Sequence, residues 1–132
     1  MKKSKLRYIN KFYSMKTLVI GASTNPERYS YKAINKLLNN QHEVVAIGAK
    51  QDQLAGVVIE KEMVNFPDIH TVTLYLNPQR QRDYYNYIIN LNPKRVIFNP
   101  GTENPEFYNL LKAKDIEFEV ACTLVLLATE QY

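Results

Sequence analysis

The stretch TLVIGASTNPERYS, residues 17–30, places a single glycine between an apolar run and a helical pattern. Residues 17–21 are mostly apolar and rich in β-branched side chains, which predicts a strand buried on both faces. Apolar side chains recur at helical spacing from about Glu27 to Asn40, after Pro26. A buried strand that turns directly into a helix is the first half of a strand–helix–strand unit, and this unit decides the fold class.

The rest of the chain repeats this alternation. Further strands are predicted at 43–48, 71–76, 95–98 and 116–120, with a short strand or hairpin piece at 56–60. Helices are predicted at about 79–91 and 105–113, each beginning at or directly after a proline. We therefore expect an α/β fold with a doubly wound, mostly parallel sheet of five or six strands in three αβα layers.

Length and charge favour one folded domain after a basic leader. The chain has 132 residues, and no apolar run approaches the ~20 residues that span a bilayer. Residues 1–14 contain five of the 17 basic residues and none of the 13 acidic ones, so the rest of the chain has a net charge of −1. We expect a disordered basic extension at 1–14 and one domain at 15–132. The alternatives for the extension are an overextended start codon and an arm that binds a polyanion.

Few side chains offer chemistry of their own. The single cysteine, Cys122, excludes an internal disulfide and favours a cytoplasmic location. His42 and His70 each precede a predicted strand, so we expect them at the amino ends of the strands as solvated or capping residues. No Cys/His cluster has the spacing of metal ligands, and no basic stripe with interleaved aromatics follows residue 14. We expect no metal, no nucleic acid and no membrane as a partner.

The loop after the first strand is suited to an anion. In doubly wound sheets the ligand lies beyond the carboxyl ends of the strands, and a helix N-terminus offers N–H groups and a favourable dipole. Gly21 allows a close approach to a phosphate, Arg28 supplies a cation, and nearby hydroxyls add donors. An ordinary tight turn without a ligand is the alternative. The other loops that follow predicted strands are Gly48–Lys50, Asn77–Pro78 and Asn99–Glu103.

Two absences narrow the ligand. The dinucleotide fingerprint has three glycines, whereas GASTNP has only the first. An NAD site usually carries an acid after the second strand, but here that strand ends in AIGAK and offers Lys50. A lysine there suits a phosphate near the ribose, and the alternative is a solvated loop residue.

Four segments, in order and spacing, resemble the CoA-binding domain family. This family is a small Rossmann-like fold, found alone in bacteria and as the nucleotide-binding part of succinyl-CoA synthetase. The segments are TLVIGASTNPERYSYKAINKLLNNQHEVVAIGAK (17–50), LYLNP (74–78), VIFNPGTENPEF (96–107) and EVACTLVLL (119–127). The resemblance covers nearly all of residues 15–132. It implies a Rossmann-like fold that binds coenzyme A or an acyl-CoA.

The resemblance also implies which residues contact coenzyme A. The diphosphate would lie on Gly21, Ala22, Ser23 and Asn25, with Arg28 and Ser30 at its margin. Gly48 and Lys50 would lie near the adenosine and its 3′-phosphate. The groove would be lined by Leu76, Asn77 and Pro78, and the pantetheine side would face Asn99, Pro100, Gly101 and Glu103. This chain departs from the family pattern V-N-P-K after the second strand, where it has IGAK.

These patterns lead us to expect a non-catalytic protein, monomeric or weakly dimeric, that binds coenzyme A or a related nucleotide. Two alternatives stay open. One is an acyl- or thiol-transfer enzyme that uses Cys122 or Glu103, although the catalytic histidine of the synthetase belongs to a separate domain. The other is a regulatory or interaction protein that has lost its ligand, as the IGAK departure allows.

Overall fold

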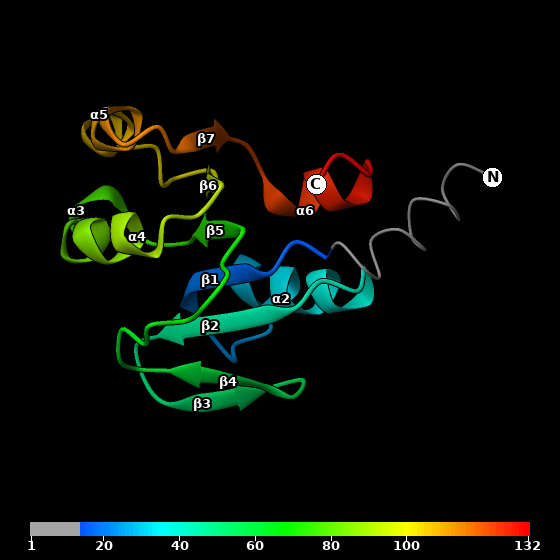
Figure 1. Ribbon diagram of the computed structural model, residues 1–132. Helices are drawn as coiled ribbons and strands as arrows, with labels where there is room; N and C mark the ends of the chain where they lie inside the picture. Colours follow the sequence, from blue (N-terminus) through cyan, green and yellow to red (C-terminus); the bar gives the residue numbers. More distant parts are fainter. Residues whose placement is uncertain (1–13) are drawn as a thin grey trace.

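Strand β1 (Thr17–Ala22) lies in the middle of a seven-stranded sheet in the computed structural model, which describes residues 14–132 (Figure 1). The strand order is β3-β4-β2-β1-β5-β6-β7. Every pair is parallel except β3–β4. The remaining strands are β2 (Val44–Gly48), β3 (Asp52–Leu54), β4 (Val57–Glu60), β5 (Thr71–Leu74), β6 (Arg95–Phe98) and β7 (Glu117–Val120).

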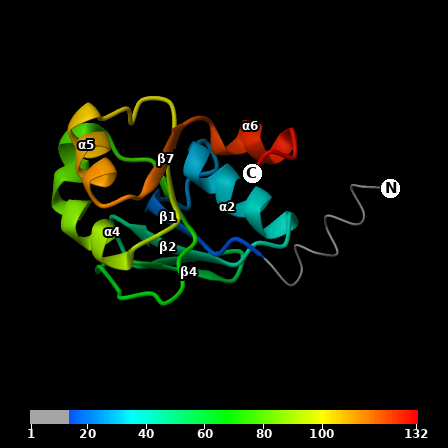
Figure 2. The ribbon, with the colours of Figure 1, turned by 45° about the horizontal axis from the view of Figure 1, so that its top comes forward.

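Helices cover both faces of the sheet. On one face lie α2 (Tyr29–Asn39) and α6 (Thr123–Ala128), which also contact each other (Figure 2). The other face carries α3 (Pro78–Gln81), the 3-10 turn η1 (Arg82–Tyr84), α4 (Tyr85–Leu91) and α5 (Pro105–Ala113). Within residues 14–132, none of the helices has the length and apolar character needed to cross a bilayer.

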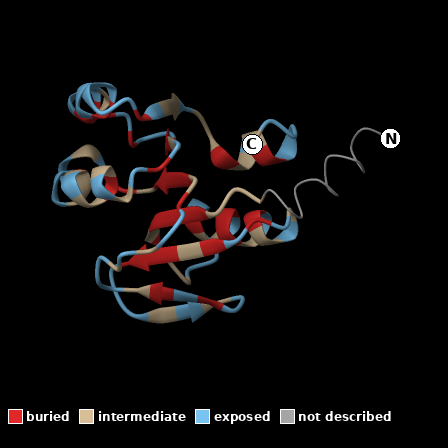
Figure 3. Ribbon diagram, in the orientation of Figure 1, coloured by how far each residue is buried: buried red, intermediate tan, exposed pale blue. Residues whose placement is uncertain are grey.

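Two apolar cores fill the spaces between the three layers. Along β1 the side chains alternate: Leu18 and Ile20 join the core under α4 and α5, while Val19 joins the core under α2. All three side chains are fully buried, as the red core of Figure 3 illustrates. Because both faces of β1 are covered, its sequence is apolar at successive positions instead of alternating with polar residues.

The expected doubly wound, three-layer architecture is confirmed, but the sheet has seven strands instead of five or six. The additional strand is β3, which pairs with β4 through a two-residue turn at Ala55 and Gly56. Both turn residues have positive φ, at 52° and 85°, as a type I′ hairpin turn requires. Strand β3 has only three residues and begins with Asp-Gln, so its sequence is too short to show the alternation of apolar and polar residues that predicts a strand.

Two of the predicted helices also differ in their boundaries, and one helix, α6, was not predicted. Helix α2 begins at Tyr29, two residues late, because Arg28 N donates to the Asn25 carbonyl at 3.0 Å and closes a turn first. The helix expected over 79–91 is divided into α3, η1 and α4. The segment after the last strand forms α6. The basic extension was expected at residues 1–14, and residues 1–13 lie outside the described part of the chain.

The direction of the winding reverses at β1. The chain passes from β1 through α2 to β2 on one side, and β5 pairs with the opposite edge of β1. A reversal of this kind leaves a crevice beyond the carboxyl ends of the strands.

Gly48 allows three strands to approach closely beside this crevice. A register shift between Ile20 and Ala22 places Ala22 opposite Gly48. A Cβ on Gly48 would lie 2.5 Å from the Ala22 carbonyl oxygen and 2.8 Å from Ile59 Cγ2. The backbone oxygen cannot move aside as a flexible side chain would.

We expect Gly48→Ala to lower the free energy of unfolding by about 2–3 kcal/mol, because the added methyl forces the strands apart. The matched control is Gly56→Ala, where φ is positive but no atom lies within 4 Å. The control should lose about 1 kcal/mol from backbone strain alone. Urea unfolding measures the free energy of unfolding of both variants. Equal decreases in the two variants would contradict the close approach at Gly48.

Candidate functional site

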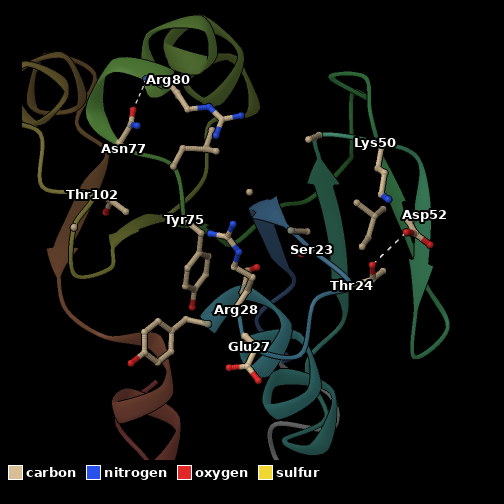
Figure 4. A pocket seen from close by; sticks show the side chains of 18 of the residues that line it. Ser23, Thr24, Glu27, Arg28, Lys50, Asp52, Tyr75, Asn77, Arg80 and Thr102 are labelled. Atoms are coloured by element: carbon tan, nitrogen blue, oxygen red, sulfur yellow. Dashed lines mark hydrogen bonds between the residues drawn. The ribbon is translucent and has the colours of Figure 1, made fainter.

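A cavity of about 790 Å³ opens beyond the carboxyl ends of β1, β2, β5 and β6 (Figure 4). Its volume is in the range of small-molecule sites. Its lining comes from four places in the chain: 21–24 with 27–30, 49–50 with Asp52 and Ile59, 75–77 with Arg80, and 100–102. The cavity therefore occupies the crevice at which the strand order reverses.

Most residues that the sequence analysis assigned to the ligand line this cavity. They are Gly21, Ala22, Ser23, Arg28, Ser30, Lys50, Leu76, Asn77, Pro100 and Gly101. The structure does not place the other five in the lining. They are Asn25, Gly48, Pro78, Asn99 and Glu103.

Two of these five shape loops at the edge of the cavity. The Asn25 side chain accepts a hydrogen bond from Glu27 N at 3.0 Å. The backbone N–H of Asn25 donates to Ser23 Oγ, also at 3.0 Å. Pro78 is the first residue of α3, directly after Asn77, whose side chain caps the helix by accepting from Arg80 N at 2.9 Å. Asn25 and Pro78 therefore support the neighbours that line the cavity.

The Asn99 side chain is committed to the protein itself. It is 2% exposed, and its Nδ2 donates to Thr73 Oγ1 at 2.6 Å and to the Leu74 carbonyl at 2.9 Å. Its Oδ1 accepts from Thr123 N at 2.8 Å. One side chain thus ties β5, β6 and the start of α6 together. Glu103 makes a similar local bond, since its Oε1 accepts from Gly101 N at 2.8 Å.

Gly21 has a structural reason to be glycine. Its φ is 93°, and a Cβ there would lie 3.0 Å from the backbone carbonyl carbon and oxygen of Tyr75. The bare residue lets the loop after β1 lie directly against the segment after β5. Both segments line the cavity.

The first turn of α2 offers uncapped amides to the cavity. Its N-cap residue is Arg28, whose side chain makes no capping hydrogen bond, and the first turn contains no acidic residue. Earlier in the loop, however, the amides of Asn25, Glu27 and Arg28 bond to acceptors within the loop. The donors left for an anion therefore lie at the start of the helix more than in the middle of the loop.

Three positively charged side chains and two acidic ones, Glu27 and Asp52, line the cavity. The cations are Arg28, Lys50 and Arg80, and none of them forms an ion pair with any residue in 14–132. Of the acids, Asp52 is held by the protein: its carboxylate accepts from Gln53 N at 2.8 Å and from Thr24 Oγ1 at 3.3 Å. Unpaired cations beside a helix N-terminus favour an anionic ligand.

The sequence analysis missed Arg80, Asp52 and Tyr75. Arg80 had a usable signal, because it lies in the first turn of a helix that begins at a predicted ligand loop. Asp52 reaches the cavity only because β3 folds back on β4, and that hairpin was not predicted. Tyr75 follows β5 and gave no signal beyond its place at a strand end.

The Tyr75 hydroxyl is buried and makes no hydrogen bond of good geometry to any described residue. Burial raises the pKa of Tyr75 to about 12, and the nearby hydroxyls of Thr123 and Thr73 oppose the rise. Those two threonines bond to each other at 2.8 Å. Tyr75 is therefore neutral at physiological pH and adds no charge to the cavity that it lines.

Catalytic groups are sparse around the cavity. Cys122 is partly exposed at the start of α6 and does not line the cavity. His42 lies two residues before β2 and His70 directly before β5, so both are at the amino ends of the strands, as expected. No group of three His, Cys, Asp or Glu residues in the described part of the chain could hold a metal ion.

The expectation that His42 is solvated is wrong, because the ring is buried in its neutral form. Its Nδ1 accepts from Met15 N at 3.1 Å, and its ring lies 5.0 Å from that of Tyr132. Burial, followed by the positive charge of Arg95, lowers the pKa of His42 below 6.5. The pKa of His70 is lowered by the same causes in the same order.

We expect stability to fall as the pH drops below 6.5, the ordinary pKa of histidine. The unfolded chain takes up protons at that pH, whereas the folded protein takes them up only at lower pH, so acid favours unfolding. His42→Gln should flatten the dependence measured by urea unfolding between about pH 7.5 and about pH 5.5. His70→Gln, at a less buried site, should flatten it less. An unchanged slope in His42→Gln would contradict burial as a neutral ring.

Comparisons with known proteins match nearly the whole of the domain and agree with its fold. The model of a family described as "CoA binding domain" matches residues 15–128. A solved structure of an uncharacterized protein is 44% identical, with a TM-score of 0.88, over 90% of this chain and 98% of that one. No curated protein matches the chain.

Two more distant structures share the fold. A hypothetical protein from Pyrococcus horikoshii is 23% identical with a TM-score of 0.77, covering 92% of this chain and 87% of that one. A protein from Thermus thermophilus is 20% identical with a TM-score of 0.80, covering all of both chains.

Proposed function

The chain belongs to the CoA-binding domain family, and on that premise we propose that it binds coenzyme A, or a related nucleotide, without catalysing a reaction of its own. One observation carries the proposal. The uncapped start of α2 and three cations that form no ion pair within residues 14–132 face one cavity at the point where the strand order reverses. This combination of donors fits a ligand with several phosphate oxygens.

The diphosphate lies at the start of α2 in this proposal. Amides of the first helical turn donate to its oxygens, and Gly21 keeps the entrance free of side-chain bulk. Arg28 and Arg80 approach from opposite sides, since one precedes α2 and the other lies in α3 (Figure 4). Two guanidinium groups on separate elements suit two linked phosphates.

The adenosine end of the ligand extends over β2 toward the β3–β4 hairpin. Lys50 is exposed at this end and binds the 3′-phosphate of the ribose. Leu76, Pro100 and Gly101 line the opposite end, which receives the pantetheine arm. Gly101 has open space where a Cβ would stand, so its backbone presents no obstacle to the arm.

Neither of the two residues considered for catalysis, Glu103 and Cys122, is placed to react with a ligand in the cavity. The Glu103 carboxylate accepts from Gly101 N, and Cys122 lies outside the lining of the cavity. A nucleophile requires a base within hydrogen-bond reach, and His42 and His70 lie at the other ends of the strands. The residues of the cavity are therefore suited to binding a ligand.

Thermal unfolding with added ligands tests the proposal. At ~100 times its dissociation constant, coenzyme A should add ~2.7 kcal/mol, which is about 10 °C in the midpoint for a domain of this size. Dephospho-CoA should give a smaller shift, because it lacks the group that Lys50 binds. No shift with coenzyme A, dephospho-CoA, NAD or ATP would contradict the proposal and favour a protein without a nucleotide ligand.

Neutral substitutions of the cations assign their roles. Lys50→Gln should weaken coenzyme A about tenfold and leave dephospho-CoA unchanged, since one charge-assisted bond is lost. Arg28→Gln and Arg80→Gln should weaken both ligands by about tenfold each. Lys36→Gln, an exposed residue at the far end of α2, is the control and should change neither affinity. Calorimetric titration measures the affinity of all four variants for both ligands. If Lys50→Gln lost the same affinity for coenzyme A and for dephospho-CoA, Lys50 would have no role at the 3′-phosphate.

A further inference from the structure

A cluster of buried polar side chains begins in the wall of the cavity, at Thr102, and continues behind it, and it has no part in the proposed ligand contacts. It consists of Gln81, Thr102 and Asn104, which are 0%, 4% and 4% exposed. Buried polar groups destabilise a fold unless they are hydrogen-bonded. In this cluster every side chain has partners, and those of Gln81 and Asn104 include residues in other segments of the chain.

Gln81 joins two walls of the cavity. Its Nε2 donates to the carbonyl oxygen of Leu76 and to that of Thr102, each at 2.8 Å. Leu76 follows β5, Thr102 lies in the loop after β6, and both line the cavity. The β5–β6 ladder ends at the pair Leu74–Phe98. Beyond that pair, the Gln81 side-chain amide joins the two walls.

Asn104 fixes the orientation of this amide. Its Nδ2 donates to Gln81 Oε1 at 2.9 Å and lies 2.8 Å from the Tyr85 hydroxyl oxygen. An amide has a donor end and an acceptor end, so a donor placed at Oε1 directs the NH₂ group toward the two carbonyls. Asn104 is itself fixed, because its Oδ1 caps α5 by accepting from Phe107 N at 3.3 Å.

We propose that Gln81 is a positioning residue that sets the separation of the Leu76 and Thr102 walls and thereby the affinity for the ligand segment between them. The identity of that segment, the pantetheine arm, rests on the proposed function. The bridge between the walls stands on the hydrogen bonds alone.

The physical advantage is a wall that is ordered before the ligand arrives. The loop after β6 contains Gly101 at a φ of 91° with open space around it. Without a tie, such a loop samples several positions, and binding must order it at a cost in affinity. Gln81 removes that cost by fixing the loop from behind, where it does not obstruct the ligand.

The test compares Gln81→Met with Gln79→Met, the same substitution at an exposed position of the same helix. The first readout needs no ligand: hydrogen exchange at the Thr102 amide should accelerate at least about tenfold in Gln81→Met, as local opening becomes easier. Amides of β1 and α2 should exchange as in the wild type. Gln79→Met should show no change anywhere.

The second readout uses two ligands. Coenzyme A should bind about tenfold more weakly to Gln81→Met, as expected when a binding wall loses its order. Adenosine 3′,5′-bisphosphate, which has no pantetheine arm, should bind within about twofold of the wild-type affinity. A general loss of stability would weaken both ligands together, so equal losses would overturn the positioning role.

A milder variant covers the case in which Gln81→Met does not fold. Asn104→Asp keeps an oxygen that caps α5 but cannot donate to Gln81 Oε1, so the amide is no longer held toward the carbonyls. The Thr102 amide should again exchange faster. Wild-type exchange at Thr102 in a folded variant would overturn the bridge. If the wild-type protein does not bind coenzyme A, the proposed function falls, and faster Thr102 exchange would still support the bridge.

Discussion

The close approach of backbones at the carboxyl end of β1 is the constraint on which the site depends. Gly21 lies against the backbone of Tyr75, and Gly48 lies against the carbonyl of Ala22, at distances that leave no room for a methyl group. The two contacts bring the segments after β1, β2 and β5 to one place. Because the winding also reverses at β1, the helix that follows leaves its amino end facing the crevice. The cavity is therefore a consequence of sheet topology and of two residues without side chains.

Buried amide side chains extend this order beyond the ends of the strands. Asn99 ties β5 and β6 to the start of α6, and Gln81 joins the loops that follow β5 and β6. Loops after strands have no ladder to define them, so such side chains decide where they lie. The cations that face the cavity, in contrast, are free of ion pairs within residues 14–132. The molecule thus combines a fixed frame with charges that are left for a ligand.

The sequence predicted the layers and the location of the site better than its details. Apolar runs such as LVIG and RVIF identified the covered strands, because a sheet with helices on both faces has no polar alternation. Position at a strand end was enough to identify Gly21, Lys50 and Asn77 as residues of the loops that line the cavity. It was not enough to find Asp52, which depends on a three-residue hairpin strand, or to show that Asn99 faces inward. Such features depend on contacts between segments distant in sequence, which local patterns do not record.

The account rests on an anion held by the amides at the start of α2, and an amide NMR titration with coenzyme A observes those amides directly. We expect large, saturable shifts of the Gly21, Ser23, Tyr29 and Ser30 amide signals, with small changes at the amino ends of the strands near His42 and His70. Saturable shifts confined to another surface, with the α2 amides unmoved, would contradict it.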